Sequence, residues 1–331
     1  MGLGGGGTDV SPYSDLFGGA ILNATINLYA QTTIEPLTSG QIIIESIDRK
    51  DAEQFAASLS LPINGRNDLV KGIYNRLVRD GFIREPLAFR ITTHVDVPVG
   101  SGLGTSSSLV ISILSAFVQW LRLPLGEYEI AHLAFEIERF DLEMAGGKQD
   151  QYAAAFGGVN FMEFYANDKV IVNPLRIKRE HLYELENNLV LYFTSTTRLS
   201  STIIETQSKN VKSDNKKPLE AMHHLKEQAI QMKEALLRGN IDTIGEILDY
   251  GFQQKKQMAE GISNQLIEEI YEAARQAGST GGKISGAGGG GFMFFYCPGN
   301  TRFRVLETLK NYPGYCRNFQ FTTSGHFSWT T

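Results

Sequence analysis

The chain has 331 residues, 42% of them hydrophobic and 20% charged, which is typical of a globular protein with one large or two ordinary domains. Its formal net charge of −5 provides no general positive field, so the composition argues against nucleic acid or a membrane as a partner, and no apolar run is long enough to span a bilayer. Two cysteines are too few for a disulfide framework and the first residues do not resemble a secretory signal, so we expect a cytoplasmic location.

The first part of the chain favours β-structure. Residues 20–37 and 41–48 are rich in β-branched side chains, and each segment ends in turn residues. Apolar residues then recur at helical spacing over 67–82, where Gly81 marks the end of the predicted helix. Residues 87–100 return to a strand-like pattern.

The next segment, PVGSGLGTSSSLVISILSAF over 98–117, runs from a glycine-rich loop directly into an apolar helix. Two further helices are predicted over 126–145 and 148–156, and a pair of glycines follows each of them. Residues 159–165 are predicted to form a strand.

The order of the elements changes after a more charged segment at about 170–186, and we place a domain boundary there, giving domains 1–180 and 181–331. A strand over 188–195 opens the second domain. The remaining predicted elements are three helices, over about 215–238, 242–258 and 264–276, and two strand regions, over 283–297 and 317–329. Strands at both ends with helices clustered between them indicate an α+β fold and not alternating β-α-β units.

Three glycine clusters stand out, at residues 2–9, 100–108 and 285–292. Glycine allows positive φ and close approach of the backbone to a ligand, so successive amides can face an anion. A single cluster is most simply a tight turn. Three clusters in one chain, each next to a strand or helix, favour a shared binding site.

The common nucleotide motifs do not account for these clusters. No G-x-x-x-x-G-K-[ST] is present, since Lys283 is followed by Ile284. Residues 286–291 match G-x-G-x-x-G formally, but a strand follows them instead of a helix, which excludes a dinucleotide-binding turn. The chain also lacks the H-R-D and D-F-G motifs of ordinary protein kinases.

The middle cluster leads into the first turn of a helix, where unpaired N–H groups and the positive end of the helix dipole favour a phosphate. Its hydroxyl groups can contact phosphate oxygens, although Ser106 or Ser107 can equally cap the helix. The residues predicted to form this phosphate-binding loop are Pro98, Gly100, Ser101, Gly102, Leu103, Gly104, Thr105, Ser106 and Ser107.

The segment PVGSGLGTSSSL resembles the central motif of the GHMP kinases, and KISGAGGGGFMFF resembles their C-terminal glycine motif. The narrower signatures LGGGGTDVSPYSDLFGG and GGKQDQYAAAFGG are similar to the branch of that family that phosphorylates a heptose 7-phosphate, with L-fucose kinase domains close by. The resemblance covers nearly the whole chain. It implies the two-domain α+β GHMP kinase fold, with a ribosomal S5 domain 2-like N-terminal domain and a ferredoxin-like C-terminal domain.

The resemblance also implies the substrates and the cofactor. We expect ATP as the phosphoryl donor, Mg²⁺ as the metal, and the anomeric hydroxyl of a sugar phosphate as the acceptor. The family usually has a strand carrying a basic residue before the first glycine run, whereas this chain begins at that run. We therefore expect either a missing strand upstream of residue 1 or a sheet edge that is built differently.

By resemblance, the catalytic residues are Asp150 and Lys148, and the metal ligands are Glu138 and Ser106, with Ser107 as the rival hydroxyl. A nearby cation and the start of a helix would keep Asp150 ionised, as a base or an orienting group requires. The sequence leaves open which of these two roles Asp150 has.

The first glycine cluster is expected to hold the sugar, with Tyr13 as an aromatic lid. Arg198 and Lys283 are candidates for binding the substrate phosphate, although an exposed Arg198 without a ligand is an equally simple interpretation. The complete set of predicted substrate-binding residues is Gly5, Gly6, Gly7, Thr8, Asp9, Tyr13, Arg198, Lys283, Gly286 and Gly288.

Two other interpretations remain open from the sequence. One is an L-fucose or other hexose 1-kinase, and the other is a sensor on the same fold that binds a sugar or nucleotide without catalysis. Retention of Glu138 and Asp150 argues against the sensor. Either a monomer or a homodimer is compatible with the sequence.

Overall fold

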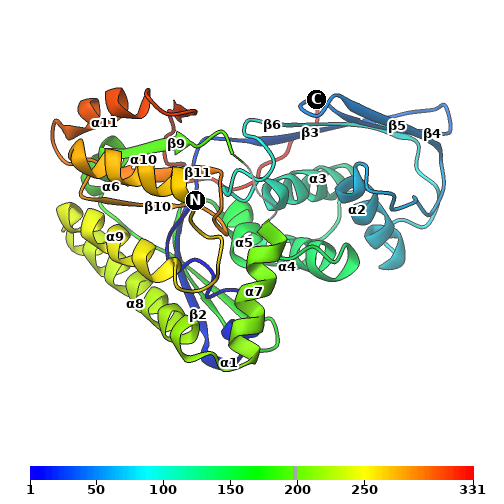
Figure 1. The fold of residues 1–331 in the computed structure, drawn as a ribbon. Helices are drawn as coiled ribbons and strands as arrows, with labels where there is room; N and C mark the ends of the chain where they lie inside the picture. Colours follow the sequence, from blue (N-terminus) through cyan, green and yellow to red (C-terminus); the bar gives the residue numbers. More distant parts are fainter. Residues whose placement is uncertain (197–199) are drawn as a thin grey trace.

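Three four-stranded sheets organise the computed structural model, which describes residues 1–196 and 200–331 (Figure 1). The first sheet has the strand order β3-β6-β4-β5, in which β4 and β6 run parallel and the other pairs are antiparallel. Its strands are β3 (Ala30–Pro36), β4 (Gln41–Ser46), β5 (Asp51–Ala56) and β6 (Phe89–Val95).

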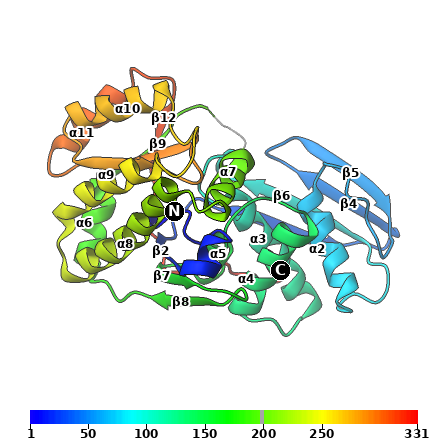
Figure 2. The ribbon, with the colours of Figure 1, turned by 60° about the horizontal axis from the view of Figure 1, so that its bottom comes forward.

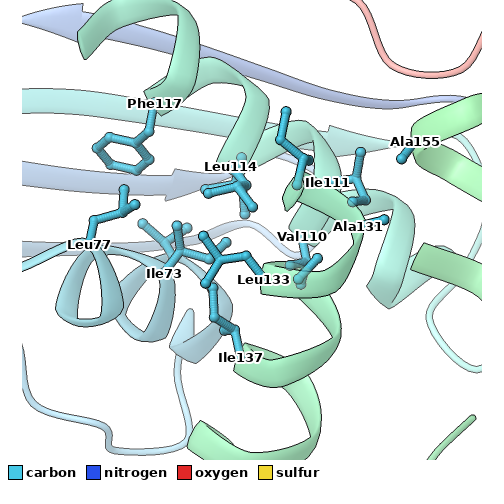
Figure 3. Packing of buried hydrophobic residues seen from close by; sticks show 14 of the residues in the cluster. Ile73, Leu77, Val110, Ile111, Leu114, Phe117, Ala131, Leu133, Ile137 and Ala155 are labelled. Carbon is cyan, nitrogen blue, oxygen red and sulfur yellow. The ribbon is translucent and has the colours of Figure 1, made fainter. Parts of the chain in front are cut away.

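One face of the first sheet is covered by helices around α3 (Figure 3). Ile73, Val110, Leu114 and Phe117 are fully buried there, because the apolar residues of α3 extend around most of the helix and need neighbours on several sides. The helices of this layer are α2 (Asp68–Arg79), α3 (Thr105–Leu121), α4 (Glu127–Glu136), the π-helical turn η1 (Ile137–Asp141) and α5 (Gln149–Phe156).

The second sheet, ordered β1-β2-β7-β8, is antiparallel and lies between the two ends of the molecule (Figures 1 and 2). Every residue of β2 is buried, because this strand contacts α5 and α8 (Lys216–Arg238) as well as its neighbouring strands. The sheet's elements are β1 (Gly2–Gly4), α1 (Tyr13–Phe17), β2 (Gly19–Ala24), β7 (Val159–Phe164) and β8 (Val170–Pro174).

The third sheet, ordered β10-β11-β9-β12, is antiparallel and forms the other end of the molecule with the later helices. Its strands are β9 (Leu189–Phe193), β10 (Gly281–Ile284), β11 (Phe292–Tyr296) and β12 (Tyr315–Arg317). The helical elements are α6 (Arg179–Asn188), α7 (Ser200–Lys212), α8 (Lys216–Arg238), the 3₁₀ turn η2 (Ile241–Thr243), α9 (Ile244–Lys255), α10 (Gln265–Gln276) and α11 (Thr301–Leu309). None of the described helices combines the length and the apolarity needed to cross a bilayer.

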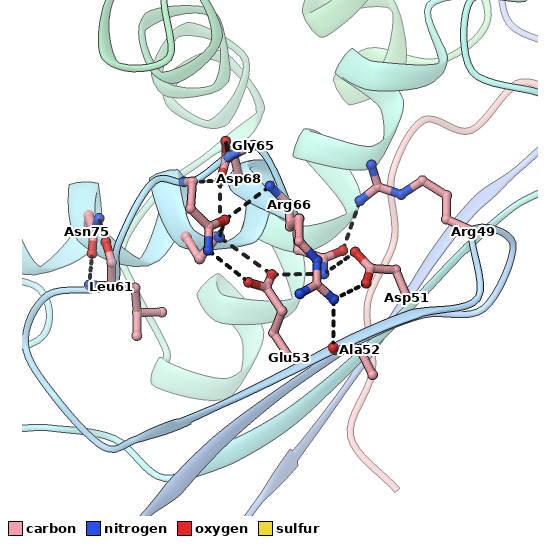
Figure 4. Close-up of polar contacts among 12 residues, drawn as sticks. Arg49, Asp51, Ala52, Glu53, Leu61, Gly65, Arg66, Asp68 and Asn75 are labelled. Carbon is pink, nitrogen blue, oxygen red and sulfur yellow. Dashed lines mark hydrogen bonds and ion pairs between the residues drawn. The ribbon is translucent and has the colours of Figure 1, made fainter.

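A polar cluster ties the β4–β5 hairpin to the start of α2, at the end of the molecule formed by the first sheet (Figure 4). The buried Lys71 ammonium lies 3.4 Å from the Glu53 carboxylate and 3.1 Å from that of Asp68. The Asn67 side chain donates to both Asp51 and Glu53 at 3.1 Å. Every charged group in this cluster has a partner, so it fixes the hairpin without leaving an obvious place for a ligand.

The α+β fold and most elements agree with the sequence predictions, but the predicted strand over 317–329 is wrong. Strand β12 ends at Arg317, and beyond it the tail makes one isolated bridge, between Phe321 and Ile26. Helices α1, α6, α7 and α11 were not predicted. Strand β8 pairs with β7 inside the charged segment, and the domain boundary at 180/181 stays a prediction.

Candidate functional site

The second and third glycine clusters lie against each other although nearly 200 residues separate them in sequence. The Ser285 hydroxyl donates to the Gly102 carbonyl at 2.8 Å, and the Phe292 N–H donates to the Ser101 carbonyl at 2.8 Å. A Cβ on Gly286 would lie 2.6 Å from the Cα of Gly102, so the two loops approach this closely only because both residues are glycine.

The first cluster meets the third through two lysines. Lys283, at the end of β10, donates to the Gly2 carbonyl at 2.9 Å. A Cβ on Gly6 would lie 3.8 Å from the Lys283 ammonium nitrogen and 4.0 Å from that of Lys255. All three clusters therefore border one site between the second and third sheets and α3.

Three glycines give the loop before α3 a backbone conformation that other residues rarely adopt. Gly100, Gly102 and Gly104 have φ values of 77°, 79° and 73°, which favour glycine. The remaining predicted loop residues support this shape, since the Pro98 carbonyl accepts the Ser101 N–H at 3.2 Å and Leu103 packs against an apolar cluster.

The N-terminus of α3 has no side-chain cap. In the part of the chain that the structure describes, the N–H groups of Thr105, Ser106 and Ser107 have no hydrogen-bond partner. Such amides, at the positive end of a 17-residue helix, are suited to an anion. The predicted cap by Ser106 or Ser107 is wrong, because both hydroxyls donate to the Glu138 carboxylate, at 2.8 and 2.7 Å.

Glu138 is the centre of a buried polar group beneath this helix. Its position in the π-helical turn η1 directs the carboxylate towards α3, and only 1% of the residue is exposed. It also accepts from the Gln151 side chain, and Arg139 lies 3.8 Å away. A carboxylate beside serine hydroxyls is the hard-oxygen donor set that Mg²⁺ prefers, so these residues fit the expected metal. Ser106 is partly exposed and Ser107 is buried, which favours Ser106 as the second ligand.

Asp150 lies in the first turn of α5, against the phosphate-binding loop. A Cβ on Gly104 would lie 2.8 Å from the Asp150 carboxyl carbon, so the loop passes directly over this side chain. Burial, together with the carboxylates of Asp9 and Glu138, raises the pKa of Asp150 to about 6, against the opposing positive charges of the chain's amino group and Arg139. Nearby positive charges thus favour the ionised form as expected, although Lys148 is not one of them, and burial outweighs their effect.

Lys148 does not pair with Asp150. Its buried ammonium lies 2.8 Å from the Asp168 carboxylate, 3.5 Å from that of Asp15 and 5.6 Å from the centre of the Phe135 ring. Its backbone N–H contacts Asp9 at the start of α5, and its predicted catalytic role stays a prediction.

In the first cluster, Asp9 organises the site and Thr8 is structural. One Asp9 carboxylate oxygen accepts the N–H groups of Lys148 and Gln149, at 2.9 and 3.1 Å, and so caps α5. The Thr8 hydroxyl is fully buried among the carbonyls of Gly5 and Ala20 and the N–H of Ala20, which leaves it no contact with a sugar.

Several other predicted residues have packing roles. The Gly5 N–H already donates to the Gln228 side chain at 3.2 Å, while a Cβ on Gly7 would meet Met258 at 2.6 Å and one on Gly288 would meet the Ile262 carbonyl at 2.7 Å. All three glycines have positive φ, so they shape the loops that border the site.

The prediction of Tyr13 as an aromatic lid is wrong. Its side chain is fully buried, and its hydroxyl lies 2.8 Å from His223 Nδ1 on α8. Burial also raises its pKa. Arg198, the other predicted substrate contact outside the glycine clusters, lies outside the described residues.

Replacing Gly147 with alanine is expected to unfold the protein at a lower temperature and to raise KM for the sugar. The new Cβ would overlap the Asp9 oxygen that caps α5, so Asp9 must move and the cap is lost. Loss of a cap and steric strain together cost about 1–3 kcal/mol. Thermal melts and steady-state kinetics measure both effects.

Gly126→Ala is the matched control, because its Cβ meets only the end of the flexible Glu129 side chain, at 3.0 Å. It is expected to leave KM unchanged. An unaltered KM and melting temperature in Gly147→Ala would contradict the positioning role of Asp9.

Lys255 was missed by the sequence analysis. It is 3% exposed, and its ammonium donates to the Gly286 carbonyl in the third cluster. Burial lowers its pKa to about 8, while the charges of Asp9 and Asp150 raise it. A signal for it does exist in the sequence, because Lys255 follows Leu248 and Phe252 at helical spacing and so falls on the buried face of α9.

A cavity of about 430 Å³ opens beside Asp9. Its walls come from the segment around η1 and from α7, and they include Arg139, Lys148 and Lys209. Asp9 therefore borders both this cavity and the start of α5, where Asp150 lies. The site thus consists of unpaired amides at α3, a buried carboxylate–serine group, Asp150, and an adjoining cavity lined by both charged and apolar side chains.

Two family models match the chain. The model of the GHMP kinases N terminal domain matches residues 68–158, and that of the GHMP kinases C terminal domain matches residues 232–314. The chain is 49% identical to the D-glycero-alpha-D-manno-heptose 7-phosphate kinase of Campylobacter jejuni, over 99% of this chain and 96% of the relative.

Two further proteins bear on the comparison. The crystal structure of a D-glycero-D-manno-heptose 1-phosphate kinase from Bacteroides thetaiotaomicron superposes with a TM-score of 0.84 at 46% identity, covering 100% of this chain and 96% of that one. The L-fucokinase/L-fucose-1-P guanylyltransferase of Bacteroides fragilis is 26% identical over 88% of this chain, which spans 33% of that longer protein. The chain belongs to the GHMP kinase family and has its two-domain α+β fold.

Proposed function

We propose that this sugar kinase transfers the γ-phosphoryl group of ATP to the anomeric hydroxyl of D-glycero-D-manno-heptose 7-phosphate, giving the 1,7-bisphosphate. The observation that carries the proposal is the approach of Gly104 to Asp150, which brings the loop expected to hold the nucleotide phosphates against the carboxylate expected to act on the sugar. The 49% identity to a heptose 7-phosphate kinase supports this choice of acceptor.

In this proposal the open amides of Thr105, Ser106 and Ser107 bind the phosphates of ATP. The positive helix end stabilises the negative charge there, and the contact of Gly102 with Gly286 holds the second and third glycine clusters together. Catalysis of phosphoryl transfer depends mainly on such positioning and electrostatic stabilisation.

Asp150 acts on the acceptor. Above a pH of about 6 its carboxylate is ionised and accepts the proton of the anomeric hydroxyl, or a hydrogen bond from it, as the oxygen bonds to the γ-phosphorus. The bond between the γ-phosphorus and the bridging oxygen breaks, and ADP leaves with that oxygen. Neighbouring Asp9 holds α5 in place and lines the adjoining cavity, which we propose takes the sugar.

Glu138 and Ser106 are the residues that would hold Mg²⁺, and they fit it as hard oxygen donors. When bound, the ion supplies positive charge to the phosphates in transfer. We also propose a cytoplasmic location, since both cysteines are free thiols and ATP is the donor.

A panel of acceptors tests the function. ADP release from purified protein is expected to be at least 100-fold faster, as kcat/KM, with D-glycero-D-manno-heptose 7-phosphate than with the unphosphorylated heptose or with L-fucose. Faster turnover of L-fucose would instead favour the fucokinase-like activity. Binding of ATP and sugar without turnover of any acceptor would favour a sensor.

A further inference from the structure

Two buried lysines, Lys255 on α9 and Lys283 on β10, point at one place in the site. Both ammonium nitrogens lie within 4.0 Å of the position that a Cβ on Gly6 would occupy. The residues are only 3% and 5% exposed, so solvent does little to screen either charge.

Neither ammonium group has a carboxylate within ion-pair distance among the described residues. Lys255 donates to the Gly286 carbonyl, and Lys283 donates to the Gly2 carbonyl at 2.9 Å. Burial lowers the pKa of both side chains, and the charge of Lys255 lowers that of Lys283 further. Two buried cations that repel each other are costly unless an anion joins them.

The location of the two lysines indicates which anion would bind to them. Lys255 bonds Gly286, the residue that touches Gly102 in the phosphate-binding loop, while its other close charges are Asp9 and Asp150, on the proposed sugar side. The two lysines therefore lie between the loop proposed to bind the phosphates of ATP and the proposed position of the acceptor hydroxyl.

We propose that Lys255 and Lys283 together bind the phosphoryl group in transfer, and that Lys255 is a further catalytic residue of this kinase. The inference rests on the function proposed above. The same chemistry would suit the distal phosphate of a sugar phosphate, and the two sources are distinguishable, because the transferred group is present with every acceptor whereas a distal phosphate is present only with some.

Lys255→Met tests the inference, with Lys256→Met as the control. Methionine keeps the length of the side chain and removes its charge. Lys256 is the next residue, and its ammonium pairs at the surface with Glu268 at 3.0 Å. Removal of one group that stabilises transition-state charge typically lowers kcat by about 10²–10³-fold, and Lys256→Met is expected to stay within twofold of the wild type.

The measurements use heptose 7-phosphate and the unphosphorylated heptose as acceptors. Equal losses of kcat with both, and less than a threefold change in either KM, would support the transferred group as the ligand. A loss confined to heptose 7-phosphate, or one expressed in its KM alone, would show a distal-phosphate site and overturn the proposal.

Binding provides a second readout. Calorimetry with ADP alone is expected to give similar affinities for the wild type and Lys255→Met, whereas aluminium fluoride, a mimic of the transferred group, is expected to tighten ADP binding only in the wild type. Equal tightening in both proteins would overturn the proposal.

Melting curves check that each variant is folded. If Lys255→Met does not fold, Lys283→Met takes its place in these measurements. Removing either buried cation is expected to leave the melting temperature equal or higher. If the wild type phosphorylates neither acceptor, the proposed function itself fails. If the wild type is active and both variants retain its kcat, only the inference about the lysines fails.

Discussion

Asp150→Asn is expected to lower kcat about 10³-fold and at the same time to make the protein more stable at pH 7.5. Asparagine keeps the shape of the side chain but neither accepts a proton nor carries the charge that orients the hydroxyl, and loss of a general base typically costs 10²–10⁴-fold. Stability increases because the variant removes a buried charge that the carboxylates of Asp9 and Glu138 repel.

The sign of the stability change follows from the pKa. Folding raises the pKa of Asp150 from 3.8 to about 6, so the folded state loses stability as pH rises through this interval. At pH 7.5 the ionised side chain costs about 1–3 kcal/mol. The gain from Asp150→Asn is therefore expected to be full above pH 6 and to vanish below about pH 4.

The activity of the wild type is expected to depend on pH in the opposite direction to its stability. Since the ionised carboxylate is the active form, kcat/KM of the wild type is expected to fall about tenfold for each pH unit below 6. Asp214→Asn, which changes an exposed carboxylate, is the control and is expected to alter neither profile. An Asp150→Asn variant with more than a tenth of the wild-type kcat would contradict a catalytic Asp150.

The local parts of the site were predictable from the sequence, and the directions of its side chains were not. Glycine clusters and the start of α3 are properties of short segments. Resemblance placed Ser106 beside Glu138, and the two side chains do meet at 2.8 Å, while their role as metal ligands stays a prediction. The exposure of Tyr13 was not a local property, because its hydroxyl contacts His223, 210 residues further along the chain.

The charges around a side chain also depend on segments that are distant in the sequence. The helix start and neighbouring Lys148 suggested an ionised Asp150, but Lys148 pairs with Asp168, and carboxylates from other segments surround Asp150. Its raised pKa results from tertiary packing, which the spacing of residues along one helix does not show.

The C-terminal tail shows that an alternating sequence pattern forms a strand only where a sheet edge is free to pair with it. Its alternating apolar residues are typical of a strand, yet the tail pairs only through the isolated Phe321–Ile26 bridge and the backbone hydrogen bonds around it, and then fits its backbone at Gly325 against Gly157. Strand formation needs a free partner edge, and the sequence does not reveal where such edges lie.

Glu138→Gln is expected to raise the Mg²⁺ concentration needed for half-maximal activity at least tenfold and to lower kcat/KM about 10²–10³-fold. The Glu138 carboxylate supplies the negative charge of the proposed metal site, and an amide oxygen is a weaker ligand for this hard cation. The fold is expected to persist, because Ser106 and Ser107 can still bond the new side chain and the Gln151 amide can turn to accept from it. The Gln151 carbonyl oxygen is buried without a partner among the described residues, so this turn gives it one.

Glu136→Gln is the control that distinguishes the loss of a metal ligand from the loss of a negative charge nearby. Glu136 lies two residues earlier and pairs with Arg76 at 2.6 Å in a partly exposed position, so its loss costs at most about 1 kcal/mol and is expected to leave the Mg²⁺ dependence unchanged. Activity titrated with Mg²⁺ and direct binding of Mn²⁺ followed by electron paramagnetic resonance provide the two readouts. Wild-type Mn²⁺ affinity in a folded Glu138→Gln variant would exclude Glu138 as a ligand, because a site that loses its only carboxylate among these donors cannot hold a divalent cation with undiminished strength.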